Sequence, residues 1–141
     1  MKTRFRLKSN KEKMGVIISE VTVTNAVDSD AKLEFSAMVD TGSTFLTLPK
    51  SWKDKLGDLL FAEEVELEMA SGEVVDGELY GGVKVKIDNF RKIYGEILFI
   101  DMEADENGKF EPLIGYLPLE AIPVSVDMGN HRLVKSKALL K

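Results

Sequence analysis

Short alternating runs of apolar and polar residues, separated by turn signals, occupy most of this chain and constrain its fold more than any other feature. The runs lie at residues 15–25, 32–40, 45–48, 65–69, 73–80, 83–87 and 93–100, with a last pair at 124–126 and 132–134. Alternation with a period of two, rich in Val, Ile and Thr, is typical of strands. Turns are expected at 28–30, 70–72, 76–77, 88–89 and 129–130. We therefore predict an all-β domain of roughly ten strands.

Two short helices are expected between these strands. Pro49 opens the first, which runs to about Leu56 and stops at Gly57. Trp52 and Leu56 are four residues apart and should pack this helix on the sheet. The second is a single turn at 119–122, after a proline. A chain of 141 residues offers room for one core of this kind.

The residue inventory excludes several kinds of chemistry. The chain has no Cys and a single His, His131, so it lacks the parts for a disulfide framework, a Cys-ligated zinc, a Cys nucleophile or a His-rich metal site. The acidic loop 101–111 does not fit a calcium loop, because Ile114 stands where a bidentate Glu belongs. We expect this loop to be solvated and to line one rim of a substrate cleft. No metal and no cofactor is predicted.

Charge is unevenly distributed along the chain. Residues 1–13 and 131–141 carry net charges of +5 and +4, whereas residues 14–130 carry −14. We divide the chain into a basic N-terminal arm at 1–13, a domain at 14–134 and a basic tail at 135–141. No nucleic-acid motif accompanies the basic ends, so we expect solvated ends or ends that meet the protein's own acidic surface.

We predict neither a nucleic-acid partner nor a membrane partner for this chain. No apolar run approaches the roughly 20 residues of a membrane span. The basic N-terminus also lacks the apolar core of a secretory signal. A cytoplasmic protein is expected.

One segment contains the candidate functional residues of this chain. In Ala37–Ser43, A-M-V-D-T-G-S, an apolar strand delivers Asp40 into a tight turn, and the chain returns as the apolar run T-F-L-T-L-P. Strands buried on both sides place Asp40 at the base of a cleft or in the core. Gly42 permits a close backbone approach. Thr41 and Ser43 supply hydroxyls that can bond a carboxylate or the neighbouring backbone.

This run resembles the active-site loop of the aspartic proteases. Leu113-Ile114-Gly115, followed by a short helix, resembles the element that packs beside that loop in the family. The hairpin tip Ala70-Ser71-Gly72 stands where the family has its flap. The order of elements over 14–134 resembles the single-domain, retropepsin-like branch, in particular its small prokaryotic and archaeal members. The resemblance implies an acid-protease-like β-barrel, closed or partly open, with a flap hairpin and one or two short helices.

The chemistry of this family needs two carboxylates roughly 3 Å apart that share one proton. This chain has one such loop. Asp76 and Asp127 are not followed by Thr or Ser and are interpreted as turn residues. The resemblance therefore implies an aspartic endopeptidase active as a homodimer, in which Asp40 of each subunit forms the dyad.

The resemblance also assigns roles to the neighbours of Asp40. Thr41 would bond across to the partner's loop, Gly42 would keep the pair accessible, and Ser43 would bond the outer oxygen of the Asp40 carboxylate. The flap would close over a peptide substrate by strand addition. The chain ends, around 134–140 and 5–7, would build a shared sheet at the interface. The alternative is a non-catalytic dimeric module that binds peptides or serves a structural role on the same fold.

Overall fold

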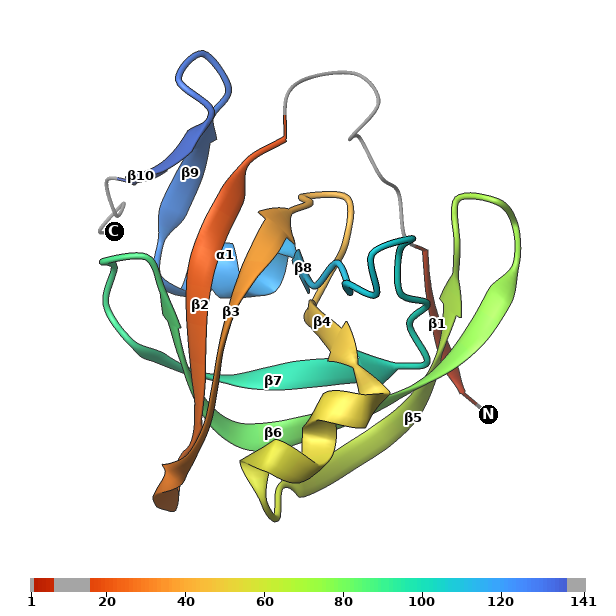
Figure 1. Cartoon of the computed structure of the whole chain (residues 1–141). Helices are drawn as coiled ribbons and strands as arrows, with labels where there is room; N and C mark the ends of the chain where they lie inside the picture. Colours follow the sequence, from red (N-terminus) through yellow and green to blue (C-terminus); the bar gives the residue numbers. More distant parts are fainter. Residues whose placement is uncertain (1, 7–15, 137–141) are drawn as a thin grey trace.

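The computed structural model of the protein describes residues 2–6 and 16–136 (Figure 1). Within these residues it contains ten strands, one 3-10 helix and one α-helix, which confirms the predicted all-β class with short helices. In chain order the elements are β1 (Thr3–Arg6), β2 (Ile18–Asn25), β3 (Asp28–Val39), β4 (Leu46–Pro49), η1 (Lys50–Leu56), β5 (Leu60–Glu68), β6 (Val74–Ile87), β7 (Ile93–Ile100), β8 (Leu113–Ile114), α1 (Tyr116–Ala121), β9 (Val124–Asp127) and β10 (Arg132–Lys135).

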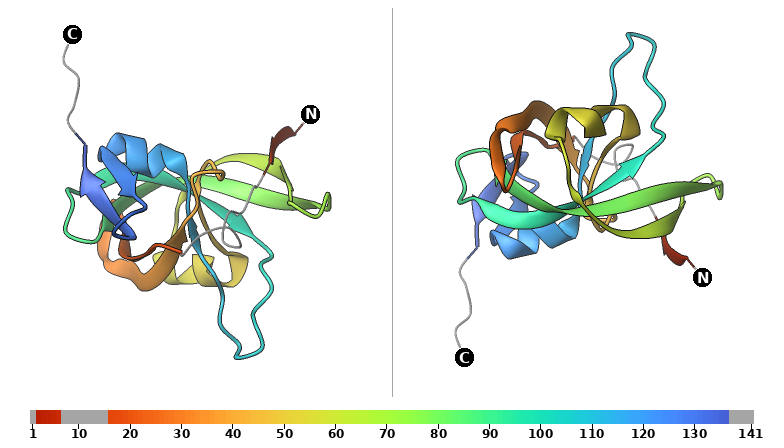
Figure 2. Two further views of the ribbon diagram at one scale, coloured as in Figure 1. Left: turned by 90° about the horizontal axis from the view of Figure 1, so that it is seen from above. Right: turned by 90° about the horizontal axis from the view of Figure 1, so that it is seen from below.

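Eight of the strands form one sheet in the order β1-β5-β6-β2-β3-β8-β4-β7, and β9 and β10 form a separate hairpin. Strand β6 also pairs with β7, so the row of strands curls round and meets itself. Figure 2 shows the long β5–β6 hairpin extending beyond this curled body, and the loop between β7 and β8 projecting from it.

Strand β8 is inserted between the two strands that flank the D-T-G-S turn. Its residues pair in parallel with β3, Met38 opposite Leu113 and Val39 opposite Ile114. On its other side, Leu113 pairs antiparallel with Thr47 of β4. The turn is therefore held from both of its ends by one distant segment of the chain.

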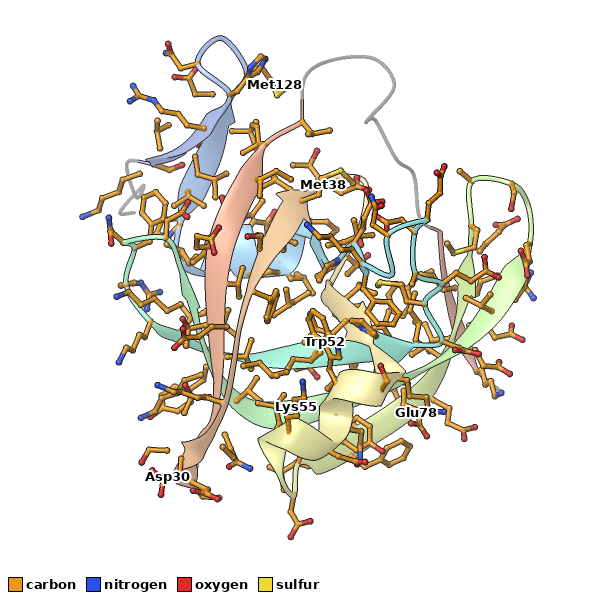
Figure 3. The ribbon with its side chains drawn as sticks, viewed as in Figure 1. Asp30, Met38, Trp52, Lys55, Glu78 and Met128 are labelled. Atoms are coloured by element: carbon orange, nitrogen blue, oxygen red, sulfur yellow. The ribbon has the colours of Figure 1, made fainter. Side chains whose placement is uncertain are left out.

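The core consists of two apolar clusters inside the curled sheet. The larger contains the most deeply buried side chains, among them Phe99, Leu48 and Leu56. Trp52 packs against it from η1, with its ring centroid 5.3 Å from that of Phe35, and Figure 3 shows it between the helix and the sheet. This position confirms that Trp52 and Leu56 pack the short helix on the sheet. The second cluster includes Met38 and Leu113 together with Val65, Leu67 and Leu79 of the β5–β6 hairpin.

Several local predictions need correction. The turn between β2 and β3 lies at Ala26–Val27, and residues 28–30, predicted as a turn, begin β3. Residues 76–77 are not a turn either, because Asp76 pairs with Glu66 inside the β5–β6 ladder. The run 83–87 is not a separate strand. It continues β6 through a bulge, which is possible because Gly82 adopts a φ of +84°.

Both helices form close to where they were expected, with shifted starts. The first is a 3-10 helix in which Pro49 is the N-cap, and it ends at Gly57, whose φ is 69°. The second begins at Tyr116, so Pro118 lies inside its first turn, where the missing N–H of proline costs no hydrogen bond.

Part of the basic N-terminal arm is a strand of the main sheet. β1 pairs in parallel with β5, with Thr3 opposite Val65 and Arg6 opposite Glu68. The Lys2 Nζ lies 3.0 Å from Asp76 Oδ1, and an Arg4 nitrogen lies 3.0 Å from Glu66 Oε1. These contacts confirm, for this stretch, the expectation that basic ends meet the protein's own acidic surface.

The remaining predictions for the chain ends concern residues 7–15 and 137–141, which lie outside the described residues. Within the single chain, the part of segment 5–7 that is described pairs with β5, and Val134 pairs with Ser125 of β9. The shared interface sheet stays a prediction. In the described part of the chain, no helix is both long and apolar enough to cross a membrane.

Candidate active site

The turn that carries Asp40 is fixed by backbone hydrogen bonds. Asp40 directly follows β3 and is 4% exposed. Its N–H donates to the carbonyl of Ile114 at 2.9 Å, and its own carbonyl accepts from the Ser43 N–H at 3.0 Å. The Gly42 N–H donates to Asp40 Oδ1 at 3.0 Å. The carboxylate therefore has one orientation set by the turn itself.

The second oxygen of the Asp40 carboxylate is left without a partner. Oδ2 is buried and accepts no hydrogen bond from any described residue. Burial raises the pKa of Asp40, and the Gly42 N–H opposes this shift to a smaller extent. The group is a buried acid at the base of a cleft, as the sequence predicted, and its free oxygen is available to a ligand, a water molecule or a second carboxylate.

The expected bond from the Ser43 hydroxyl to the outer oxygen of the carboxylate is not formed within this chain. Ser43 is 3% exposed, and its N–H is used to close the turn by donating to the Asp40 carbonyl. Thr41, in contrast, is exposed at the surface of the turn. The turn thus points one hydroxyl inward and one outward.

Residues 113–115 pack against this turn, where the sequence placed them. The Gly115 N–H donates to the Phe45 carbonyl at 3.0 Å, and the next amide, of Tyr116, donates to Ser43 at 2.9 Å. A Cβ on Gly115 would lie 2.5 Å from the carbonyl carbon of Thr44 and 2.6 Å from the Phe45 nitrogen. Only glycine allows the backbone of α1 to approach the returning strand so closely.

The flap residues lie at the tip of the β5–β6 hairpin. Ala70, Ser71 and Gly72 form its turn, which is closed by a hydrogen bond of 2.9 Å from the Gly72 N–H to the Met69 carbonyl. Gly72 has a φ of +89° and no other atom within 4 Å of its Cβ position. All three residues of the tip are exposed.

A cleft with a volume of about 390 Å³ joins the turn, the flap and the 101–112 loop. Asp40, Ala70 and Leu113 are the residues from the predicted site that line it. Thr41, Gly42, Ser43, Ser71, Gly72, Ile114 and Gly115 are not among its described walls. The prediction that the acidic loop lines one rim is confirmed, since Asp101, Met102, Glu103 and Glu111 all border the cleft.

Sequence reasoning missed the apolar floor of this cleft. Its described apolar walls include Met38, Met69, Val75 and Ile100, and Figure 3 shows Met38 at the end of β3. Met38 pairs with Leu113 in the β3–β8 register, so both side chains share one face of the sheet. Met38 and Val75 lie in consecutive apolar residues, A-M-V and V-V, so the local pattern does not tell which face each side chain occupies. The strand order supplies that information.

The other candidate residues lie away from the cleft. Asp127 ends β9, and its Oδ2 accepts from Asn130 Nδ2 at 2.9 Å, which lowers the pKa of Asp127. Asp76 lies in β6 and forms an ion pair with Lys2. His131 lies in the β9–β10 turn. None of the three lines the described cleft. Within residues 2–6 and 16–136, no group of three or more His, Cys, Asp or Glu side chains is arranged to hold a metal ion.

Comparison with known proteins agrees with this geometry. Among solved structures, the EIAV protease complexed with the inhibitor HBY-793 is similar to this chain, with a TM-score of 0.52 and 17% sequence identity. The match covers 86% of this chain and 99% of the protease chain, and it shows an acid-protease-like fold. No curated protein matches the sequence.

A family model described as aspartyl protease matches residues 18–116. That span contains the catalytic-type turn, the flap hairpin, the cleft and the Leu113–Gly115 segment, and it covers most of the chain. The chain belongs to the aspartyl protease family, in its retropepsin-like form.

Proposed function

We propose that this protein is an aspartic endopeptidase that works as a homodimer, with one Asp40 from each subunit in the catalytic pair. The observation that carries the proposal is the Asp40 carboxylate itself, buried at the base of a cleft with Oδ2 unpartnered among the described residues. Hydrolysis by this chemistry needs an acid and a base at the same moment. One carboxylate cannot be both, and the chain has a single D-T-G-S turn.

The surface beside the turn supports a second copy as the source of the other carboxylate. Tyr116 and Leu117 are each 39% exposed, although their amides bond to the carbonyls of Ser43 and Thr44. Thr41 is exposed in the same turn. Apolar side chains next to a catalytic turn suit an interface better than solvent, and a two-fold axis there would bring the two turns together.

In the proposed dimer the two Asp40 carboxyl groups share one proton, because two carboxyl groups this close do not both ionise easily. The ionised member takes a proton from a water molecule, whose oxygen attacks the peptide carbonyl carbon. The protonated member gives its proton to the carbonyl oxygen. The tetrahedral intermediate then collapses and the C–N bond breaks. The leaving nitrogen receives the proton that the first Asp40 took from water, and a hydroxyl of the intermediate returns its proton to the other Asp40 as the carbonyl re-forms.

The flap hairpin completes the site in this scheme. Its tip at 70–72 closes over the extended peptide, whose backbone adds to the hairpin as a strand does. The apolar floor takes a side chain next to the bond that is cut. Closure removes water from the cleft and strengthens the electrostatic interactions there.

Subunit mixing tests both parts of the proposal. Asp40→Asn keeps the shape of the side chain and removes the base, so the variant should cut no peptide. Mixed in excess with wild-type protein, it should suppress activity, because most wild-type subunits then carry an inactive partner. The matched control is Asp127→Asn, which changes the same atoms outside the cleft and should leave the activity of the mixture unchanged.

The outcomes separate the alternatives. Wild-type activity that survives any excess of Asp40→Asn would show that a single chain suffices. A wild-type protein that dimerises and binds peptides without cutting them would support the non-catalytic module. Sedimentation of the wild-type protein and of Asp40→Asn, each at the concentration used in the activity assay, measures whether they form dimers.

A further inference from the structure

The cleft above Asp40 is lined by carboxylates that come from separate parts of the chain. Asp40 lies at its base, Glu73 comes from the flap, and the 101–112 loop contributes Asp101, Glu103 and Glu111. No Lys, Arg or His is among the described residues that line it. The cleft therefore gathers five carboxylates from three separate segments of the chain.

This charge differs from the acidic charge elsewhere on the same hairpin. On its outer face, Asp76 and Glu66 are paired with Lys2 and Arg4 at 3.0 Å each, and Glu78 is paired with Lys50 at 3.5 Å. By contrast, Glu73, Asp101 and Glu103 form no ion pair with any described residue. Asp76, Glu66 and Glu78 therefore have cationic partners, whereas the three acids at the cleft have none among the described residues.

The base of the 101–112 loop is held against the cleft. The Met38 N–H donates to the Pro112 carbonyl at 3.0 Å, which fixes the end of the loop beside β3. At the tip, Asp105 Oδ1 accepts from the amides of Asn107 and Lys109 at 2.8 and 2.9 Å. Asp101 directly follows β7, so the other end of the loop also begins at the sheet. The tip is closed on itself and projects away from the body of the molecule (Figure 2).

The floor between the carboxylates is apolar. Met38, Val75, Ile100 and Leu113 line it, and Met69 and Met102 at its edge are flexible side chains that adapt to different shapes. A ligand that fits must therefore offer an apolar group to the floor and positive charge to the rim. Like charges in a cleft focus a field that attracts cations and repels anions.

We infer that the preferred substrates of this cleft are extended peptides that carry Lys or Arg on either side of an apolar residue. The inference rests on the proposed peptidase function and adds the substrate class to it. The apolar residue occupies the floor beside Asp40, and the basic side chains reach Glu73 from one side and Asp101 and Glu103 from the other.

The test uses three peptides with one apolar centre, flanked by Lys, by Gln or by Glu. At low salt, wild-type protein should cut the Lys peptide at least about tenfold faster than the Glu peptide. The ratio should shrink as salt is raised, because screening shortens the reach of the rim charges. Asp101→Asn and Glu103→Gln should each lower the ratio about two- to fivefold.

The matched control is Glu106→Gln. It removes the same charge from the exposed tip of the same loop, away from the described cleft walls, so the ratio should stay at the wild-type value. Equal cleavage of the three peptides by wild-type protein would overturn the inference. A drop with Glu106→Gln as large as that with Glu103→Gln would also overturn it, because net charge alone would then explain the preference.

A binding measurement separates this inference from the proposed catalysis. The three peptides, labelled with a fluorophore, are titrated into the Asp40→Asn protein and followed by anisotropy. Binding in the order Lys, Gln, Glu supports the acidic cleft even if wild-type protein cuts none of them, a result that would remove the peptidase proposal alone. Binding without that order, or no binding of any peptide, would overturn the inference.

Discussion

The substitution Gly115→Ala tests whether the close packing behind the catalytic turn is needed. A Cβ at this position would lie 2.5 Å, 2.6 Å and 2.7 Å from three backbone atoms of Thr44 and Phe45, whereas ordinary contact begins at 3.4 Å. The φ of Gly115 is −82°, which suits alanine, so the cost comes from overlap and not from backbone strain. Backbone atoms cannot rotate aside as a side chain can.

The size of the effect follows from these contacts. Overpacking in a core costs about 1–3 kcal/mol, and contact with backbone alone puts this site at the upper end. The gain from a less flexible unfolded chain offsets about 0.4–1 kcal/mol. A net loss of about 2 kcal/mol should lower the melting temperature by roughly 6–10 °C in a domain of this size. Displacement of the turn should also lower peptide cleavage.

Melting is measured by circular dichroism at one fixed protein concentration, since association shifts the apparent stability. Gly129→Ala is the matched control, because the nearest atom to its Cβ is the flexible Asp127 Oδ1 at 3.4 Å. That variant should stay within about 0.5 kcal/mol of wild type. If Gly115→Ala melts like Gly129→Ala and cuts peptides at the wild-type rate, the packing argument is wrong.

Three further substitutions have defined outcomes. Asn25→Ala should cost about 2–3 kcal/mol in urea unfolding, because its buried Nδ2 donates to the carbonyls of Leu56 and Asp58 at 2.8 Å each; exposed Asn107→Ala serves as the control. Phe5→Ala removes an edge-to-face contact with Phe45 at 4.9 Å, so β1 amides should exchange faster, at a loss of about 1–2 kcal/mol. Burial raises the pKa of Asp40, so the folded protein binds more protons and loses stability as pH rises through that pKa. Asp40→Asn should therefore gain melting temperature over wild type from about pH 4 upward, and a difference that does not change with pH would contradict the buried, raised-pKa carboxylate.

The parts of the fold that sequence analysis predicted depend on local pattern. β2 shows alternating burial along its length, as its alternating residues require, and Gly57 ends the helix that Pro49 begins. The D-T-G-S turn is equally local, since its hydrogen bonds join residues two or three positions apart. Local chemistry was therefore enough to place Asp40 at the end of a buried strand.

The parts that were missed depend on partners far along the chain. Charge assigns Thr3–Arg6 to a basic arm, and residues 5–7 are expected in a sheet shared between subunits. In the single chain this stretch pairs instead with β5, where Lys2 and Arg4 lie beside Glu64 and Glu66. One local prediction is also wrong. Residues 28–30 carry turn-forming side chains, but the turn lies at Ala26–Val27 and Asp28 joins the ladder opposite Asn25. The floor and rim of the cleft meet only after β8 is inserted between β3 and β4.

The Asp40 turn and the cleft rim place different physical demands on the chain. The turn is buried, closed by its own amides and packed against Gly115 with no spare space, so changes there should reduce turnover for every peptide. The rim consists of exposed carboxylates on a loop and at the tip of the β5–β6 hairpin. Removal of a single charge there should alter which peptide is held and leave the fold intact. Kinetics can separate the two: a rim variant should change kcat/KM for cationic peptides relative to neutral ones, whereas a turn variant should lower kcat for both alike.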